Sequence, residues 1–322
     1  STEESRWASF VVTMSMAVGM ALGGGLSDAV CLRFGDRYGR RLIALVGMLL
    51  CALCAWLGVR SDDPARVTLL FSLSLGTIGM CEHKRAYGWH IHGAMSEFLL
   101  TEERSCRILP ESIPFEDATF LACSAGTAFA SMKKLDSFAS NGYLAVVGLG
   151  PIGVVGSLIA QAKGWKTIAF DLSANRVEFA KQHGIHAFCP QKDIPLKDQI
   201  TSYMNGKLPI RVFDTSGHPE GLADAFDIAD KKGHIVTIGK GKRSYTMSQR
   251  IDISEIILKE LTFQGSWVFT IPDYEELVQF MVDNSLSFNP IVTGRFPFSE
   301  GQAAFERAAD LNNAGKTVFV KK

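Results

Sequence analysis

The order of apolar and polar residues divides the chain into two parts that predict different structures. Three uncharged runs, residues 7–26, 42–59 and 67–80, are apolar all round and predict helices. After residue 80, short apolar stretches alternate with amphipathic ones, which predicts strands joined by helices. The strand-like stretches are residues 143–147, 167–171, 186–189, 210–215, 234–239 and 261–265. This alternation indicates an α/β fold with a doubly wound parallel sheet.

Composition marks the same boundary near residue 80. The first 80 residues contain no Lys, Asn, Gln or His, and Lys84 is the first lysine. The later part has the mixed charge of a globular enzyme. The formal net charge of the whole chain is zero, which argues against nucleic acid as a partner. We therefore interpret the chain as two segments of different origin.

The first segment has the features of membrane-spanning helices. The runs 7–26 and 42–59 reach the length of about 20 residues that a helix needs to cross a bilayer. The linker at 31–41 carries four arginines, which predicts that it faces the cytoplasm. By this topology, the part after residue 80 lies in the cytoplasm. The alternative is a helical hairpin inside a soluble core.

A short motif in this linker adds a family likeness. Residues 35–41, Gly-Asp-Arg-Tyr-Gly-Arg-Arg, resemble the signature between the second and third helices of major facilitator transporters, and residues 26–28 extend the likeness. In that family the Asp and Arg form a charge relay between two halves of the transporter. Three helices cannot enclose a pathway between two halves. The resemblance therefore implies a membrane-associated fragment that does not transport.

A glycine-rich turn in the second segment predicts a nucleotide site. The strand at 143–147 leads into Gly148-Leu149-Gly150-Pro151-Ile152-Gly153, a helical run follows, and the next strand ends at Asp171. This is the G-x-G-x-x-G fingerprint in its proper context, with an acid 18 residues after the last glycine. The glycines allow a tight turn, a close approach of pyrophosphate and close helix–strand packing. The acid would bind the adenosine ribose and favours NAD over NADP, although Arg176 is nearby.

Residues 81–322 resemble the zinc-dependent medium-chain alcohol dehydrogenases of the threonine and polyol dehydrogenase type. The motifs that carry the likeness are residues 93–98, 108–118, 121–128, 265–267, 271–273, 293–296 and 314–318. The resemblance implies a Rossmann domain beside a partial catalytic domain, with NAD and zinc as cofactors. It also implies that Thr215, Gly239 and Lys316 contact the cofactor, with Lys316 near its phosphates.

The zinc ligands that the resemblance implies are mostly missing from this sequence. Cys123 stands at the position of one catalytic zinc ligand, and Cys81 could correspond to the last of four structural zinc ligands. Catalytic zinc needs three protein ligands, and the early ligands of the family have no counterpart here. His90 and His92 are a further, weaker metal hypothesis. Cys123 is therefore either a remaining zinc ligand or an inert core thiol.

The cysteines otherwise point to a reducing compartment. There are seven, an odd number at scattered positions, which argues against a disulfide framework. Cys51 and Cys54 form a C-x-x-C inside an apolar run, where small buried residues are the simpler interpretation.

These observations predict four segments. They are a transmembrane-like segment at 1–80, a partial catalytic domain at 81–135, the NAD-binding Rossmann domain at 136–268 and the rest of the catalytic domain at 269–322. The predicted function is hydride transfer between NAD and a secondary alcohol, polyol or hydroxy-amino acid. One alternative is an inactive NAD-binding remnant fused to a membrane fragment, and another is a joined product in which neither half works. The family likeness also implies a homo-oligomer formed through the edge of the cofactor sheet.

Overall fold

A computed structural model describes residues 87, 90, 93–94, 99–101, 106–136, 142–240, 247–310 and 312–320. The chain divides into two units, residues 1–92 and 93–322, and the fold below is that of the second unit. The three predicted membrane spans and Cys81 lie outside the described residues. No helix among the described residues is long and apolar enough to cross a membrane.

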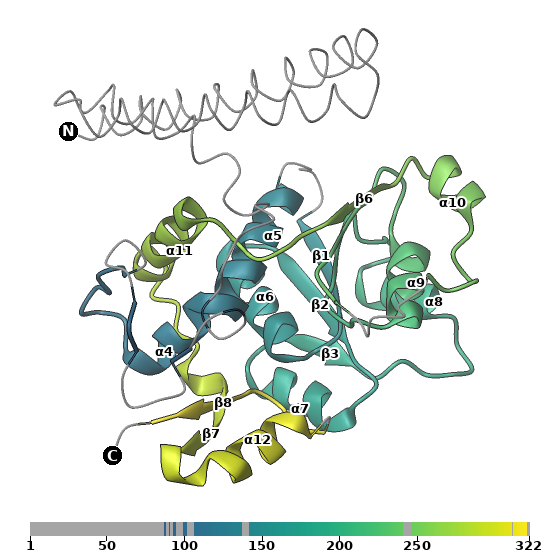
Figure 1. Cartoon of the computed structure of the whole chain (residues 1–322). Helices are drawn as coiled ribbons and strands as arrows, with labels where there is room; N and C mark the ends of the chain where they lie inside the picture. Colours follow the sequence, from purple (N-terminus) through teal and green to yellow (C-terminus); the bar gives the residue numbers. More distant parts are fainter. Residues whose placement is uncertain are drawn as a thin grey trace, which may run out of the picture. The chain divides into compact units, whose positions relative to one another are not determined.

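The core of the second unit is a parallel sheet of six strands (Figure 1). The strands are β1 (Tyr143–Val147), β2 (Lys166–Phe170), β3 (His186–Phe188), β4 (Arg211–Asp214), β5 (His234–Thr237) and β6 (Thr262–Gly265). Their order in the sheet is β3-β2-β1-β4-β5-β6, so the direction of winding reverses between β1 and β4. The predicted doubly wound α/β sheet is confirmed, with each strand within one or two residues of its predicted bounds.

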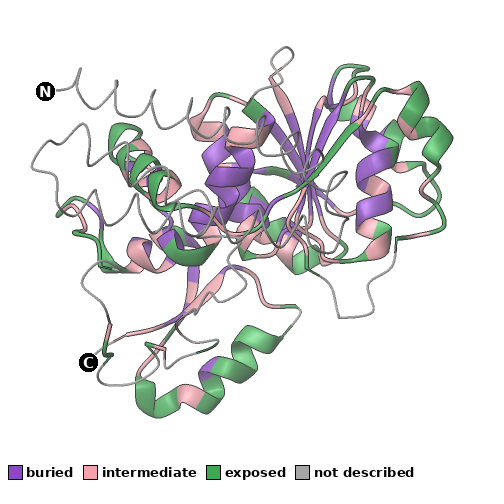
Figure 2. Cartoon of the chain, turned by 45° about the horizontal axis from the view of Figure 1, so that its top comes forward, coloured by how far each residue is buried: buried purple, intermediate pink, exposed green. Residues whose placement is uncertain are grey.

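Helices cover both faces of this sheet, because alternate strand residues are apolar on both sides. Leu144 and Val146 of β1 pack with α5 (Gly126–Asp136), α6 (Pro151–Ala162) and α7 (Ala174–Gln182). Ala145 and Val147 of the same strand pack with α8 (Leu196–Tyr203) and α9 (Pro219–Ile228). Strands that are buried on both faces suit a parallel sheet. Figure 2 shows the buried strands at the centre of the fold.

The remaining elements form a smaller layer beside the sheet, except α10 (Ile253–Leu258), which lies on the β6 side of the sheet (Figure 1). The elements of this layer are α4 (Phe115–Phe120), the π-helix η3 (Leu121–Ala125), α11 (Ile271–Asp283), the 3-10 helices η4 (Asn289–Ile291) and η5 (Phe298–Glu300), β7 (Val292–Phe296), α12 (Gly301–Ala309) and β8 (Lys316–Phe319). β7 and β8 pair in parallel as a separate sheet. The buried carboxylate of Asp117 in α4 accepts hydrogen bonds from Ser287 Oγ at 3.1 Å and from the N–H of Phe288 at 2.8 Å. This contact joins two regions that the sequence assigns to one partial catalytic domain.

Candidate cofactor site

The turn between β1 and α6 has an open N-terminal helix end at its centre. Gly148 adopts a φ of 92°, which favours glycine. Gly150 is the N-cap of α6, with no side chain capping the helix, and a Cβ added to it would meet nothing within 4 Å. A Cβ on Gly153 would lie 2.0 Å from the carbonyl oxygen of Gly148. The turn is therefore closed on its inner side and open at Gly150, where unpaired N–H groups could receive a phosphate.

Two further predicted residues complete the geometry of α6. Pro151 occupies the first turn of the helix, where its missing N–H costs nothing. Ile152 packs at the edge of the main core. Pro151 thus favours the start of the helix, and Ile152 anchors the first turn against the core.

Asp171 lies directly after β2 and is held against the glycine turn. Its Oδ2 accepts a hydrogen bond from the N–H of Leu149 at 2.7 Å, and its Oδ1 accepts one from the N–H of Ser173 at 2.8 Å. Arg176 Nη1 lies 3.6 Å from Oδ2. A carboxylate has about four lone-pair sites, so capacity remains for hydroxyl groups of a ligand.

Thr215 and Gly239 lie at the carboxyl ends of β4 and β5, where they brace the turn. Thr215 Oγ1 donates to the carbonyl oxygens of Val147 and Gly148, at 3.1 and 3.0 Å. A Cβ on Gly239 would lie 2.2 Å from the backbone nitrogen of Gly217, so the two loops meet backbone to backbone.

The carboxylate of Asp214, at the end of β4, was not singled out by the sequence analysis. Asp214 is fully buried at the end of β4. Its Oδ1 accepts hydrogen bonds from the N–H and Oγ of Ser216, and its Oδ2 accepts one from Thr237 Oγ1 at 2.7 Å. The available sequence signal was an acidic residue at the end of an apolar strand, followed by Thr215 and Ser216. A buried carboxylate needs hydrogen-bond donors close by, and hydroxyl residues can supply them.

Lys316 and Cys123 are neighbours, and among the described residues no hydrogen bond joins either side chain to the glycine turn. Lys316 Nζ donates to the carbonyl oxygen of Thr119 and lies 4.4 Å from the ring centre of Phe120. Burial lowers the pKa of Lys316 to about 8, although the neighbouring Cys123 opposes the shift. Cys123 is exposed, and its Sγ lies 3.4 Å from Thr127 Oγ1. Exposure excludes the alternative that Cys123 is a core thiol.

The described residues do not fit a zinc site. Among them, no group of three His, Cys, Asp or Glu side chains could hold a metal ion. The polar neighbours of Cys123 are a threonine hydroxyl and a lysine ammonium, and neither is a usual zinc ligand. Cys81 and His92 lie outside the described residues.

The fold and the turn together define a dinucleotide-binding class of protein, and the comparisons with known proteins give the family. A family model described as "Zinc-binding dehydrogenase" matches residues 151–283. A zinc-type alcohol dehydrogenase-like protein of Escherichia coli K12 is 30% identical over 242 residues, which cover 74% of this chain and 66% of that protein. These matches support the zinc-binding medium-chain alcohol dehydrogenase family for the second segment of this chain.

Other relatives are polyol enzymes. The D-xylulose reductase of Saccharomyces cerevisiae is 27% identical over 234 residues, which cover 70% of this chain and 64% of that enzyme. The chain thus spans just under two thirds of the length of these curated relatives. No comparison supports the predicted likeness of residues 1–80 to a transporter.

Solved structures share the fold. A short chain alcohol dehydrogenase of Escherichia coli CFT073, complexed with NADH, superposes with a TM-score of 0.66 at 20% identity, covering 80% of this chain and 73% of that one. The alcohol dehydrogenase of Thermus sp. ATN1 gives a TM-score of 0.65 at 22% identity, covering 72% of this chain and 67% of that one. At these identities the likeness concerns the fold alone.

Proposed function

We propose that this chain is an NAD-dependent oxidoreductase that transfers hydride between the nicotinamide and a small alcohol, polyol or hydroxy-amino acid. The observation that carries the proposal is the open N-terminus of α6 at Gly150 with the carboxylate of Asp171 beside it. An open helix N-terminus suits a pyrophosphate, and an adjacent carboxylate suits the ribose hydroxyls.

The charge at this site favours NAD as the cofactor. The carboxylate of Asp171 would repel the 2′-phosphate of NADP, while its free lone pairs can accept from ribose hydroxyls. Leu172, the next residue, is 90% exposed and offers an apolar surface beside the ribose position.

The names of the relatives support the class of substrate. They include the D-xylulose reductase already described and an L-threonine 3-dehydrogenase of Bacillus subtilis, which is 29% identical over 192 residues. Both names indicate a small hydroxyl or carbonyl compound. Hydride chemistry belongs to the nicotinamide, and the protein supplies binding and orientation.

Titration with NAD tests the cofactor proposal. We expect the wild-type chain to bind NAD, and Asp171→Asn to weaken binding by roughly 10- to 100-fold, because a hydrogen bond to a charged group contributes about 1.5–3 kcal/mol. Asp227→Asn is the matched control, since Asp227 is an exposed acid of α9 paired with Arg250. Calorimetry that shows no heat for the wild type at millimolar NAD would refute the proposal.

A second candidate is an NAD-binding protein without turnover. It is favoured by the donor set around Cys123, which does not fit zinc among the described residues. Metal analysis of the purified chain, combined with NADH formation from sorbitol and L-threonine, separates the two. Stoichiometric zinc with alcohol-dependent NADH supports the oxidoreductase, whereas NAD binding with neither supports the second candidate.

A further inference from the structure

Arg176 connects the acid of the cofactor site with the loop that precedes β8. Its Nη1 lies 3.6 Å from Oδ2 of Asp171, and its Nε donates to the carbonyl oxygen of Asn313 at 3.2 Å. The side chain of Arg176 is 22% exposed and that of Asp171 is 11% exposed. A guanidinium can serve both partners because its donors form a rigid planar fork.

In the loop at residues 310–315, the described residues, which are 310 and 312–315, are hydrogen-bonded to one another and to β7. The N–H of Asn313 donates to the carbonyl oxygen of Asp310 at 3.0 Å, and the N–H of Asn312 donates to Oδ1 of Asp310 at 2.9 Å. Thr293 Oγ1 of β7 donates to the carbonyl oxygen of Ala314 at 2.7 Å. A displacement of Asn313 is therefore passed along the loop.

The far end of this loop is the start of β8. Gly315 has a φ of 75°, and a Cβ added there would lie 2.5 Å from the carbonyl oxygen of Ile291 and 3.0 Å from Cζ of Phe179. The next residue is Lys316, whose ammonium contacts Thr119 and Phe120 and lies beside Cys123. Only two residues separate the carbonyl that Arg176 holds from Lys316.

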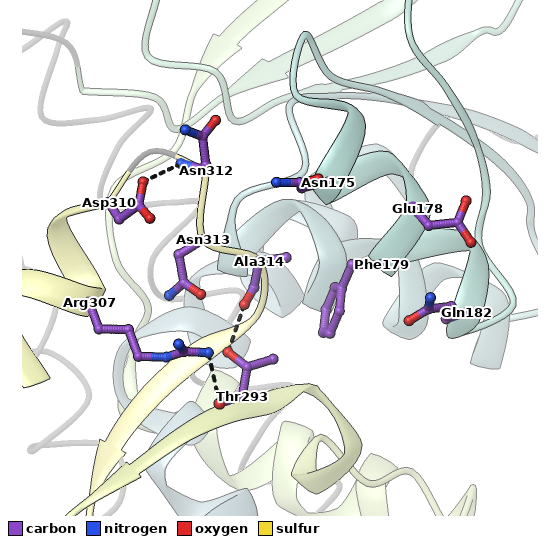
Figure 3. Close-up of a pocket in the computed structure, with 10 residues that line it drawn as sticks. All are labelled: Asn175, Glu178, Phe179, Gln182, Thr293, Arg307, Asp310, Asn312, Asn313 and Ala314. Carbon is purple, nitrogen blue, oxygen red and sulfur yellow. Dashed lines mark hydrogen bonds between the residues drawn. The ribbon is translucent and has the colours of Figure 1, made fainter.

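An open pocket adjoins this connection (Figure 3). It has a volume of about 410 Å³ and lies between α7, through Asn175 and Phe179, and the loop, through Asn313 and Ala314. Besides the approach of Phe179 to Gly315, this gap leaves few contacts that can transmit movement between α7 and the loop. Among the described residues, the bond from Arg176 to Asn313 is the one side-chain hydrogen bond between α7 and residues 310–315.

We infer that Arg176 is a positioning residue that couples ribose binding at Asp171 to the placement of the loop 310–315 and of Lys316. The inference rests on the proposed NAD site. A ribose diol on Asp171 changes the partner that Arg176 faces, and Arg176 transmits this change to the carbonyl of Asn313. Coupling is reciprocal, so a loop released from Arg176 weakens the binding of NAD in turn.

Hydrogen–deuterium exchange of peptides that cover residues 312–319 tests the coupling. In the wild-type chain we expect NAD to slow exchange in these peptides. In Arg176→Met we expect faster exchange without ligand, no added protection with NAD, and NAD affinity lower by about fivefold or more, the usual size of a coupling. Peptides in α9, far from the link in sequence, serve as the internal reference.

Two further variants test whether the hydrogen bond from Arg176 to Asn313 is responsible, rather than the positive charge at residue 176 or the side chain of Asn313. Arg176→Lys keeps a positive charge near Asp171, but one ammonium cannot span both partners; we expect it to restore NAD affinity in part without restoring protection of the loop. Asn313→Ala keeps the backbone acceptor and should behave as the wild type.

The outcomes distinguish this inference from the proposed function. If NAD binds and protects residues 312–319 equally in the wild type and in Arg176→Met, the coupling is refuted while the NAD site stands. If the wild type does not bind NAD, the proposed function falls and the coupling falls with it. Unchanged exchange of unliganded Arg176→Met would by itself show that the link does not hold the loop.

Discussion

Two glycines of the β1–α6 turn, three positions apart, have opposite needs for space. A Cβ at Gly150 meets nothing within 4 Å, and its φ of −65° suits any residue. A Cβ at Gly153 would overlap the carbonyl oxygen of Gly148. The two positions therefore separate the requirement for ligand access from the requirement for packing.

Alanine at each position tests this division. We expect Gly150→Ala to keep the wild-type stability but to weaken NAD binding tenfold or more, because the methyl group occupies the phosphate approach. We expect Gly153→Ala to lower the free energy of unfolding by about 1–3 kcal/mol or more, the usual cost of overpacking. Urea denaturation and NAD titration of both variants give the answer. Equal effects of the two variants on stability would contradict the geometry.

Lys316 gives a pH-dependent prediction. Its pKa falls from an ordinary value of 10.5 to about 8 through burial. Below pH 8 the ammonium is charged in both the folded and the unfolded state, and its burial lowers the stability of the fold. Between pH 8 and about 10.5 only the folded state has lost the proton. The stability of the wild type therefore rises with pH in this range, relative to a variant without the amine. We expect Lys316→Met to be more stable at pH 7 by about 1–3 kcal/mol, with the gain shrinking as the pH rises to 10.5. Unfolding curves across this range measure it, and a constant gain would refute it.

The site residues show what the sequence can predict. The positions of Gly148, Gly153 and Asp171 followed from local spacing, because neighbouring elements form the turn. The environment of Lys316 did not, since its partner Thr119 lies 197 residues away in the sequence. Such a contact leaves no local pattern.

At the scale of elements, α11 has the most explicit local determinants. Thr270 and Asp273 form a capping box at its start, and Lys133 of α5 lies 2.9 Å from Oδ1 of Asp273. Burial raises the pKa of Asp273, but hydrogen bonds from Thr270 and Lys133 outweigh it and lower the pKa overall. This carboxylate therefore stabilises the fold above its unfolded pKa, near 4, and the contribution is lost as the pH falls.

Neutralising this cap tests its contribution. We expect Asp273→Asn to lower the free energy of unfolding by about 1–2 kcal/mol at pH 7, and we expect this deficit to be smaller at pH 3 because the pKa of Asp273 is lowered in the folded state. Urea unfolding at the two pH values measures the difference. The control is Glu275→Gln on the same helix, which loses only a longer pair to Arg107 at 3.6 Å and should change little at either pH. A deficit of the same size at both pH values would show that the charge of Asp273 is not responsible.

Elements with a strong pattern were the ones that the sequence predicted. The apolar strands of the large sheet lie within one or two residues of their expected places because burial on both faces demands continuous apolar runs. The π-helix at Leu121–Ala125 and the short helix α10 were not predicted. Helices of five and six residues are too short for a helical period to be recognised in the sequence.

At the scale of the whole molecule, the sheet has an open edge. All four residues of β6 are exposed, and among the described residues β5 is its one neighbour in the sheet. The adjacent α10 exposes Ile257 at 68% and Leu258 at 74%. Unpaired strand edges with apolar neighbours favour association. The predicted homo-oligomer would bury this edge.

Sedimentation equilibrium tests this association. We expect the chain to form dimers and Ile257→Lys to weaken them at least tenfold, because a buried lysine without a partner is costly. Phe305→Lys replaces an apolar residue of α12 that is 55% exposed and is the matched control. If both variants shift the equilibrium equally, or neither does, β6 and α10 are not the interface.

The strand order also has a consequence for synthesis on the ribosome. β1, β2 and β3 follow one another along the chain, so this half of the sheet can assemble before β4 is translated. Its glycine turn would still lack Thr215, whose hydroxyl bonds the carbonyls of Val147 and Gly148 from the neighbouring β4. A nascent chain that stops near residue 190 should therefore have the fingerprint sequence without a competent nucleotide pocket. The arrival of β4 both seals the exposed side of β1 and completes the pocket, so capture of the cofactor would report that the two halves have joined.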